Sequence, residues 1–314
     1  MRDERAITER LKKLVSVPSG SRLVLGIGDD CAIYRPRGSA DDLLFTTDMF
    51  VEGTHFLRSS YPPAAAGRKA VARSLSDIAA MGGAPRFCLV SLCVAPWSGP
   101  KWVDRFFDGL AKIAGEFGTI LAGGDLSHGE TVVCDVMICG SVPRGRALRR
   151  DGARPGHRIY VSGALGGAAL GLTMKSGKAR QRQVNPEPRL ALGQFLREAL
   201  HASSAMDVSD GLSLDLERLC LASGVDAEIT FPPQFPGSSP EQALHGGEDY
   251  ELLFTVPEGQ KVPSRFRDLE LTQIGRITRP KSNGGSVFLN SERLRAQGYD
   301  HFREHGREYS VSST

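Results

Sequence analysis

Hydrophobic residues in the first half of the chain follow two different spacings. Apolar residues spaced by three and four positions predict amphipathic helices over residues 4–15, 63–79 and 100–117. Continuous or alternating apolar runs predict strands at 24–25, 43–45, 87–94 and 131–139. The last two runs are apolar on both faces, so we expect buried strands that one small domain cannot cover alone. Alternation of strands with helices predicts an α/β domain that closes near Pro143.

The rest of the chain has the features of a second unit, so the sequence predicts two domains, residues 1–143 and 144–314. Further strands are predicted at 157–162, 250–256, 274–277 and 287–289, and further helices at 168–172, 189–201 and 212–220. The polar segment from Lys175 to Pro188 is predicted to be a mobile loop. Glycines at 163–167 predict a turn whose backbone N–H groups can face an anion, although glycine there also permits close packing.

The composition is that of an ordinary globular protein, with 314 residues of which 40% are hydrophobic and 24% charged. No run approaches the ~18 apolar residues of a membrane span, and the amino-terminal residues lack the apolar core of a signal peptide. We therefore expect a cytoplasmic protein without a membrane partner. The six cysteines contain no CxxC pair and are expected to be buried thiols in a reducing compartment.

A net charge of +3 is too small to indicate nucleic-acid binding. Six arginines nevertheless crowd one segment: Arg144, Arg146, Arg149, Arg150, Arg154 and Arg158. A solvated linker explains this run equally well, and Tyr160 is the only aromatic residue beside it. Because the segment offers no platform for base stacking, we expect no nucleic-acid partner.

Carboxylates stand beside glycines or after strand-like runs at five places along the chain. Near the amino terminus, Asp30 follows a glycine-rich turn, and Asp48 follows two threonines at the expected end of the strand at 43–45. Asp125 lies in a turn predicted at 123–125, directly after a short strand predicted at 120–122. Oxygen ligands of this kind suit Mg²⁺, which completes its shell with water and substrate phosphates. The five places must converge in space or be unrelated turns. We interpret Asp29, Asp41 and Asp42 as ordinary turn residues.

Asp77 lies off the apolar stripe of the helix predicted at 63–79. It follows Arg73 by four positions, which allows an ion pair on the helix surface. Such a pair stabilises a helix by only about 0.2–0.5 kcal/mol. From spacing alone, a functional and a structural role for Asp77 both stay open.

Segments spread over nearly the whole chain are similar to the motifs of one family. They read GDDCAI at 28–33, TTDMFVEGTHF at 46–56, SLSDIAAMGG at 74–83, GGDL at 123–126, DVSDGL at 207–212, GGEDYELLF at 246–254 and GYDHF at 298–302. On these residues the chain resembles the thiamine-monophosphate kinase family, in the superfamily that includes aminoimidazole ribonucleotide synthetase.

The resemblance implies a two-domain α/β (α+β) fold whose amino-terminal domains pair across a homodimer and whose carboxy-terminal domain carries a mixed sheet with helices. It implies several Mg²⁺ ions held by Asp30, Thr46, Thr47, Asp48, Asp77, Asp125, Asp207 and Asp210. ATP would contact Gly124, Asp125, Arg150 and Ser209, and thiamine monophosphate would face His55, Glu248 and Tyr299. Ser74 and Phe107 depart from the family pattern, which usually has asparagine and tyrosine there.

The activity implied is ATP-dependent phosphorylation of thiamine monophosphate to thiamine diphosphate, the last step of thiamine diphosphate biosynthesis. A phosphate monoester has a second pKa of about 6, so its oxygen is already ionised at neutral pH and needs no general base. The obstacle is charge repulsion, which several Mg²⁺ ions relieve while they align both phosphates for direct in-line transfer. We therefore expect neither a catalytic base nor a covalent nucleophile.

Two alternative functions stay open. Another enzyme of the superfamily would use ATP to activate a different oxygen or selenium nucleophile. Selenophosphate synthetases require a reactive cysteine near a lysine in an amino-terminal loop, and hydrogenase-maturation relatives require a terminal cysteine, whereas this chain ends in Ser-Val-Ser-Ser-Thr. A nucleotide or divalent-cation sensor that keeps the fold without catalysis is the second alternative.

Overall fold

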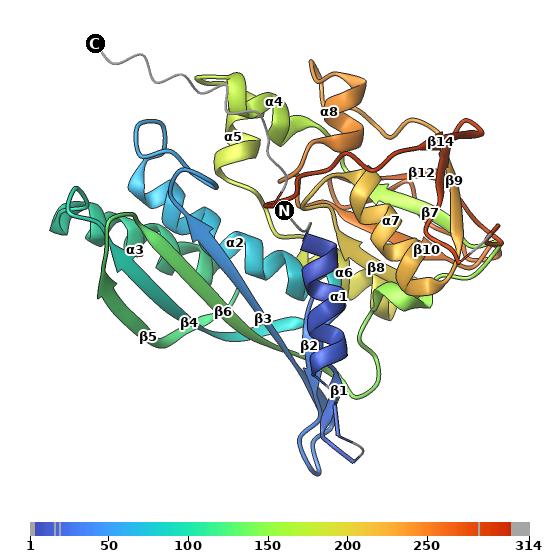
Figure 1. The fold of residues 1–314 in the computed structure, drawn as a ribbon, viewed down its shortest axis with the longest axis horizontal. Helices are drawn as coiled ribbons and strands as arrows, with labels where there is room; N and C mark the ends of the chain where they lie inside the picture. Colours follow the sequence, from blue (N-terminus) through green and yellow to red (C-terminus); the bar gives the residue numbers. More distant parts are fainter. Residues whose placement is uncertain (1–3, 16, 19, 282, 303–314) are drawn as a thin grey trace.

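Two β-sheets with helices packed against them form the body of the molecule, and they lie side by side in Figure 1. The computed structural model describes residues 4–15, 17–18, 20–281 and 283–302. Residues 303–314, the end of the predicted second domain, lie outside these ranges. No helix in the described part of the chain is long and apolar enough to cross a membrane.

The first sheet has six strands in the order β1-β2-β3-β6-β4-β5. Its strands are β1 Leu23–Leu25, β2 Ala32–Tyr34, β3 Asp41–Val51, β4 Ala84–Val94, β5 Ile120–His128 and β6 Val133–Pro143. β4 and β5 pair in parallel, and the other neighbours are antiparallel. β3 and β6 pair along their whole length, which gives the sheet a long and regular centre.

Two helices, both predicted from the apolar spacing, cover one face of this sheet (Figure 1). α2 Pro63–Ala80 and α3 Pro100–Glu116 both begin at proline, which suits the first helical turn because it lacks an N–H that would be unpaired there. The helices cross closely, since a Cβ on Gly67 would lie 1.9 Å from the carbonyl oxygen of Phe106. Glycine there lets the two backbones touch, which fixes α2 in place.

The opposite face of the first sheet is exposed in a single chain. β4 alternates between buried residues such as Val90 and exposed ones such as Leu89, and every residue of β5 is exposed. Ile120 and Leu126 are 68% and 67% exposed although both are apolar. In a single chain β4 is therefore buried on one face only, because α2 and α3 cover only that face, and this agrees with the expectation that one small domain cannot cover both faces.

Two predicted strand ends lie inside longer strands. Thr46–Asp48 stands at the middle of β3 and pairs with residues 136–138 of β6. Gly123–Asp125 continues β5 and pairs with residues 89–91 of β4 instead of turning. A Cβ on Gly124 would lie 1.8 Å from a backbone oxygen of β4, so this glycine permits close approach of two strands and makes no turn.

Asp41 and Asp42 also belong to β3, so their interpretation as turn residues is wrong. Asp42 is buried and accepts hydrogen bonds of 2.6 and 2.8 Å from the Arg35 guanidinium. It accepts another, of 2.8 Å, from the backbone N–H of Gly145. Asp42 therefore ties the first strands to the segment that connects the two sheets.

The second sheet is mixed, with the order β14-β13-β9-β12-β7-β10-β8 and with β11 paired to β12. Its strands are β7 Arg158–Ser162, β8 Ser204–Asp207, β9 Asp226–Ile229, β10 Leu252–Val256, β11 Arg265–Phe266, β12 Leu269–Thr278, β13 Val287–Leu289 and β14 Glu292–Leu294. Helical elements of this half are the 3₁₀ turn η1 Arg150–Gly152, α4 Gly167–Thr173, α5 Lys178–Val184, α6 Leu190–Glu198, α7 Leu212–Ser223 and α8 Pro240–His245. The amino-terminal helix α1 Glu4–Leu14 has no buried residue and lies between the two sheets in the view of Figure 1.

The predicted mobile loop from Lys175 to Pro188 instead contains α5, which packs on α4. Gln183 of α5 is buried, and its amide donates a hydrogen bond to the Tyr61 hydroxyl of the first domain. The prediction fails because these polar side chains bond across the junction of the two domains and are not all solvated.

The glycine turn before α4 does face an anion, and that anion is part of the protein. The buried Asp249 carboxylate accepts hydrogen bonds from the backbone N–H groups of Gly166, at 2.5 Å, and Ala168, at 3.0 Å. Burial raises the pKa of Asp249 to about 6, and the two N–H donors oppose that rise. These donors are used within the fold and are not free to bind a phosphate.

Candidate functional site

Three aspartates from distant parts of the chain meet at the junction of the two domains, and we call them the acid cluster. Asp30 lies in the turn after β1, Asp77 lies in the last turn of α2, and Asp207 ends β8. One oxygen of each carboxylate lies within 4.8 Å of one oxygen of each of the other two. The fold thus brings together three of the acids that the resemblance assigned to metal binding.

Hydroxyl groups hold two of these carboxylates. The Thr46 hydroxyl of β3 donates to Asp77, and the Ser76 hydroxyl of α2 donates a hydrogen bond of 2.7 Å to Asp207. Burial raises the pKa of Asp77 and of Asp207 well above the ordinary range, and neighbouring carboxylates raise it further. A cluster of this kind favours a proton or a cation, and Mg²⁺ prefers such carboxylate oxygens.

Arg150 ties the turn after β1 to the second half of the chain. Its guanidinium donates to Oδ1 of Asp30, and its backbone N–H donates to Asp29 at 3.1 Å. Oδ2 of Asp30 is buried and has no hydrogen-bond partner among the described residues, a costly state that a bound cation would relieve. Asp29 does bond to the backbone of its own turn, but burial and the charge of Asp30 raise its pKa to about 7.

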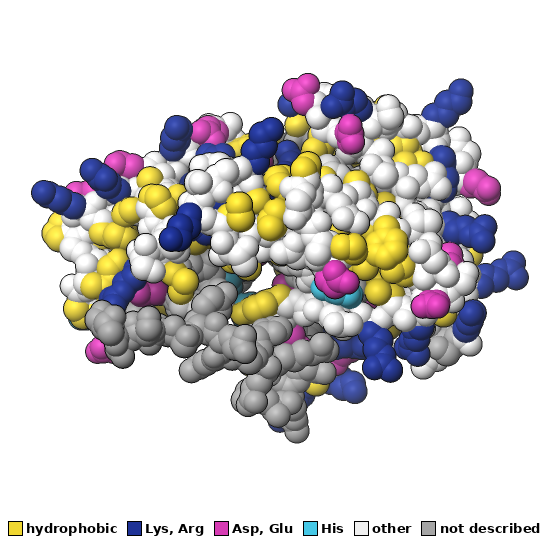
Figure 2. Space-filling view, turned by 90° about the horizontal axis from the view of Figure 1, so that it is seen from above, with side chains coloured by type: hydrophobic (Ala, Val, Ile, Leu, Met, Phe, Trp, Pro, Cys, Tyr) yellow, Lys and Arg dark blue, Asp and Glu magenta, His cyan; other side chains and the backbone are white. Residues whose placement is uncertain are grey.

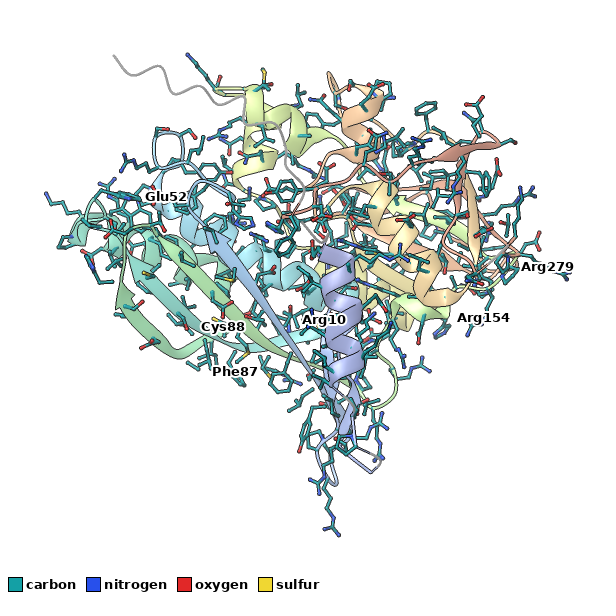
Figure 3. The ribbon with its side chains drawn as sticks, in the orientation of Figure 1. Arg10, Glu52, Phe87, Cys88, Arg154 and Arg279 are labelled. Carbon is teal, nitrogen blue, oxygen red and sulfur yellow. The ribbon has the colours of Figure 1, made fainter. Side chains whose placement is uncertain are left out.

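The other arginines of the run do not gather at one place. Arg154 is exposed and lies at the far edge of the second domain in Figure 3. Arg149 pairs with Asp151. Figure 2 shows lysines and arginines spread over one face of the molecule and not gathered in one patch. Neighbours in this run therefore serve separate structural purposes.

Asp48 lies beside the acid cluster. Its carboxylate accepts hydrogen bonds from Ser74 at 3.2 Å and from Arg73 at 3.4 Å. After burial, the charge of Asp48 is the next cause of the raised pKa of Asp77. The ion pair of Arg73 is thus made with Asp48, which leaves Asp77 to face the cluster. Ser74 keeps a polar role although it stands where asparagine is usual.

Thr47 and Asp210 have other partners in this structure. Thr47 is exposed on the opposite face of β3 from Thr46, and its hydroxyl donates to Asp135 at 2.7 Å. Asp210 forms an ion pair with Arg218. Neither side chain belongs to the acid cluster as the structure stands.

Gly124 and Asp125 lie farther away within one chain. They stand on β5, which is three strands from β3, or about 14 Å at ordinary strand spacing. Phe107, where tyrosine is usual, is on α3 and packs against the core of the first domain. A single chain does not bring these residues to the acid cluster.

His55, Glu248 and Tyr299, which we call the acceptor group, gather near the same junction. The ring centroids of His55 and Tyr299 lie 5.3 and 4.9 Å from that of His301. Burial raises the pKa of the Tyr299 hydroxyl, and the charge of Glu248 adds to that rise. The backbone N–H of Glu248 donates to the carbonyl of Ser209 at 2.7 Å, which joins this group to the loop after β8.

His55 is held in one protonation state. Its Nδ1 accepts a hydrogen bond of 3.0 Å from the backbone N–H of Val51, so the proton of the neutral ring is on Nε2. Burial lowers the pKa of His55 to about 2, which keeps the ring neutral. Nε2 is buried without a hydrogen-bond partner among the described residues. His55 can therefore offer one N–H donor to a ligand.

Sequence reasoning missed several buried charged residues, and Lys69 and Asp215 are two of them. Lys69 is fully buried on α2 between the buried residues Ala66 and Ala70. Its position on the apolar stripe of the helix is the feature of the sequence that could have predicted a buried charge. Asp215 on α7 accepts hydrogen bonds of 3.0 Å from two backbone N–H groups of the turn before that helix. Asp215 is the fourth residue of α7, a position at which no pattern in the sequence indicates a buried acid.

Comparison with known proteins identifies the family. Residues 28–142 match the N-terminal domain, and residues 154–287 the C-terminal domain, of AIR synthase related proteins. The thiamine-monophosphate kinase of Escherichia coli K12 is 37% identical over an alignment of 306 positions, and the match covers 88% of this chain and 92% of that protein. The chain belongs to the thiamine-monophosphate kinase family. The thiamine-monophosphate kinase of Aquifex aeolicus is 34% identical over 299 residues, with coverage of 88% and 92%.

Solved structures of thiamine-monophosphate kinases are similar to this chain in fold. A structure described as AaThiL complexed with AMPPCP and TMP has a TM-score of 0.83 at 33% identity and covers 96% of this chain and 99% of that one. The thiamine-monophosphate kinase of Stenotrophomonas maltophilia has a TM-score of 0.74 at 34% identity, with coverage of 91% and 95%. Hydrogenase maturation protein HypE in complex with ATP, at 17% identity and a TM-score of 0.66, shares the fold alone. The predicted two-part mixed fold and the kinase family are confirmed.

Proposed function

We propose that this chain transfers the γ-phosphate of ATP to thiamine monophosphate and so forms thiamine diphosphate. The observation that carries the proposal is that the acid cluster and the acceptor group meet at one domain junction, where α2 carries Asp77 and, through Lys69, bonds Glu248. The names of its relatives and the AMPPCP and TMP in the related structure support this choice of substrates. Residues 1–143 and 144–314 would act as two domains that close one site between them.

Several Mg²⁺ ions fit the acids of this site. The buried and unpaired oxygen of Asp30 favours a cation in the acid cluster, and Asp48 and Thr46 extend the set of oxygen ligands on β3. Bound Mg²⁺ would neutralise the two phosphates and template their in-line alignment. Thr47 and Asp210 remain in the proposed ligand set only if their side chains leave their present partners.

The chain itself would bind and orient the two substrates. Arg150 and Ser209 lie next to the acids and are proposed to contact ATP. At the other end, Tyr299 offers a ring face to a cationic thiazolium, a contact worth about 0.5–2 kcal/mol. His55 is neutral with Nδ1 already bonded, so it serves as a donor and not as a base. The ionised phosphate acceptor requires no base.

A homodimer would complete this site. The exposed outer face of the first sheet includes Leu89, Ile120 and Leu126, an apolar surface that a second copy of the chain would cover. Gly124 and Asp125 stand on the edge strand of that face, far from the acid cluster of their own chain. We propose that they reach ATP and Mg²⁺ at the site of the other copy.

Acceptor-dependent consumption of ATP tests this function. Purified protein with Mg²⁺ should consume ATP rapidly when thiamine monophosphate is present and at least about 100-fold more slowly without it, because water lacks the fixed position of the bound acceptor. A sensor would bind ATP with no acceptor-dependent product. A rate of ATP consumption that is the same with and without thiamine monophosphate would contradict the proposal.

A further inference from the structure

Lys69 is a charged residue that the proposed reaction has not yet used. It lies on α2 with a side chain that is 0% exposed, and its Nζ is 2.8 Å from each carboxylate oxygen of Glu248. A buried ammonium is stable only with a compensating charge and hydrogen bonds. Among the described residues, Glu248 is the only acid that forms an ion pair with it. The negative charge of Glu248 therefore compensates the buried positive charge of Lys69.

Tyr61 fixes the position of Lys69 from the other side. Its oxygen lies 3.1 Å from Nζ and accepts that hydrogen bond, and it accepts another from the amide of Gln183. The Arg180 guanidinium lies 4.9 Å from the centroid of the Tyr61 ring and donates to Gln183 at 2.6 Å. The ammonium is thus held by residues of both domains and has little freedom to move.

Glu248 itself is placed with strain. Its φ of 66° lies in the left-handed region, which is unusual for a residue with a side chain. Its backbone N–H donates to the carbonyl of Ser209, and its side chain stays 24% exposed. A carboxylate accepts about four hydrogen bonds, so those from Lys69 leave lone pairs free.

We propose that Lys69 is a positioning residue that fixes Glu248 and neutralises its charge. Glu248 then recognises an N–H donor of the acceptor substrate, the amino group of its aminopyrimidine ring, instead of pairing with the thiazolium charge. This inference rests on the proposed function. The two modes of recognition predict opposite effects when the lysine is lost.

The experiment compares Lys69→Met, Glu248→Gln and the double variant in steady-state kinetics. Lys69→Met should raise the KM for thiamine monophosphate by at least about tenfold and leave the KM for ATP within about twofold, because the freed carboxylate loses its orientation. The double variant should return to within about threefold of wild type, because the neutral amide keeps an acceptor oxygen and no longer needs the lysine. Arg68→Met is the matched control, since Arg68 is the adjacent residue of α2 and pairs at the surface with Glu116.

If Glu248 instead attracts the thiazolium, Lys69→Met should lower the KM for thiamine monophosphate and the double variant should be the weakest binder. Either result, or an unchanged KM in Lys69→Met, overturns the inference while wild-type turnover still supports the proposed function. If Lys69→Met does not fold, the double variant alone tests the inference. A KM for thiamine monophosphate at least about tenfold above that of the wild type would then contradict it. A wild type that does not phosphorylate thiamine monophosphate overturns both.

Discussion

Ser76 of the first domain donates a hydrogen bond of 2.7 Å to Asp207 of the second, with both side chains buried. This bond connects α2 to the end of β8 at the point where the acid cluster forms. One helix therefore supplies an acid, Asp77, and also orients an acid of the other domain. The geometry of the cluster depends on how the domains meet.

The first prediction concerns metal binding by the acid cluster. Asp77→Asn and Asp207→Asn should each lower phosphoryl transfer by at least about 100-fold, because each removes an anionic ligand. Mg²⁺ should raise the Tm of the wild type and raise it less in both variants, as measured by calorimetry with and without a chelator. Equal Mg²⁺-dependent shifts in all three proteins would remove the cluster from metal binding.

The second prediction uses two neighbours on β3. Thr46→Val should raise the Mg²⁺ concentration needed for half-maximal activity by about 10–100-fold, because the hydroxyl that orients Asp77 is lost. Thr47→Val should leave it within about threefold, since that side chain is on the other face of the strand. Titration of activity with Mg²⁺ measures both. A larger effect in Thr47→Val than in Thr46→Val would contradict the assignment of Thr46 to the inward face and Thr47 to the outward face of β3, unless Thr47 turns toward the metal.

The third prediction concerns the exposed face of the first sheet. The wild type should be a homodimer at micromolar concentration, and Leu126→Asp should be a monomer with strongly reduced activity, because a charge on a covered apolar face is costly. Light scattering gives both masses. A matched change at Leu172, which is 56% exposed on α4, should leave the mass unchanged. A monomeric wild type would refute the pairing.

The fourth prediction concerns stability and pH. Glu251 is buried and bonded to Arg189 at 2.7 and 3.0 Å, and also to Arg182 and Ser162. Burial acts to raise the pKa of Glu251, but the two arginines outweigh it and hold the pKa below its ordinary value of 4.5. Glu251→Gln should therefore lower the free energy of unfolding by about 3–5 kcal/mol at neutral pH.

Because its folded pKa is depressed, the contribution of Glu251 is complete above pH 4.5 and declines as pH falls through the folded pKa. The difference between wild type and Glu251→Gln in urea unfolding should accordingly shrink below about pH 4.5. A difference that stays constant from pH 7 to pH 3 would mean that the charge of Glu251 contributes little.

Elements with strong local periodicity could be predicted from the sequence. The helices α2 and α3 begin and end within a few residues of their expected limits, because proline, glycine and apolar spacing all act locally. The middle of β3 could not be predicted in the same way. Thr46 and Asp48 are polar, so in the sequence they look like the end of a strand. They lie on the inward face of β3 because Asp77 and Ser74 of α2, which comes later in the chain, form hydrogen bonds with them.

Long-range pairing explains the other differences. α5 was missed because its polar residues are stabilised by Tyr61, more than a hundred residues away in the sequence. The anion in the glycine turn before α4 is Asp249, which no local pattern could assign to it. Within the candidate site, motifs singled out the acids of the cluster but not Lys69, whose partner Glu248 comes from the other domain.

The central claim is tested most directly by the identity of the product. Purified protein with ATP and Mg²⁺ should convert thiamine monophosphate to thiamine diphosphate, separated by chromatography, and should turn over unphosphorylated thiamine at least about 100-fold more slowly. An alcohol has a pKa far above 7 and would need a general base, which we propose that this site does not supply, whereas the phosphate oxygen is already ionised. Absence of thiamine diphosphate, or equal turnover of thiamine and its monophosphate, would contradict the account.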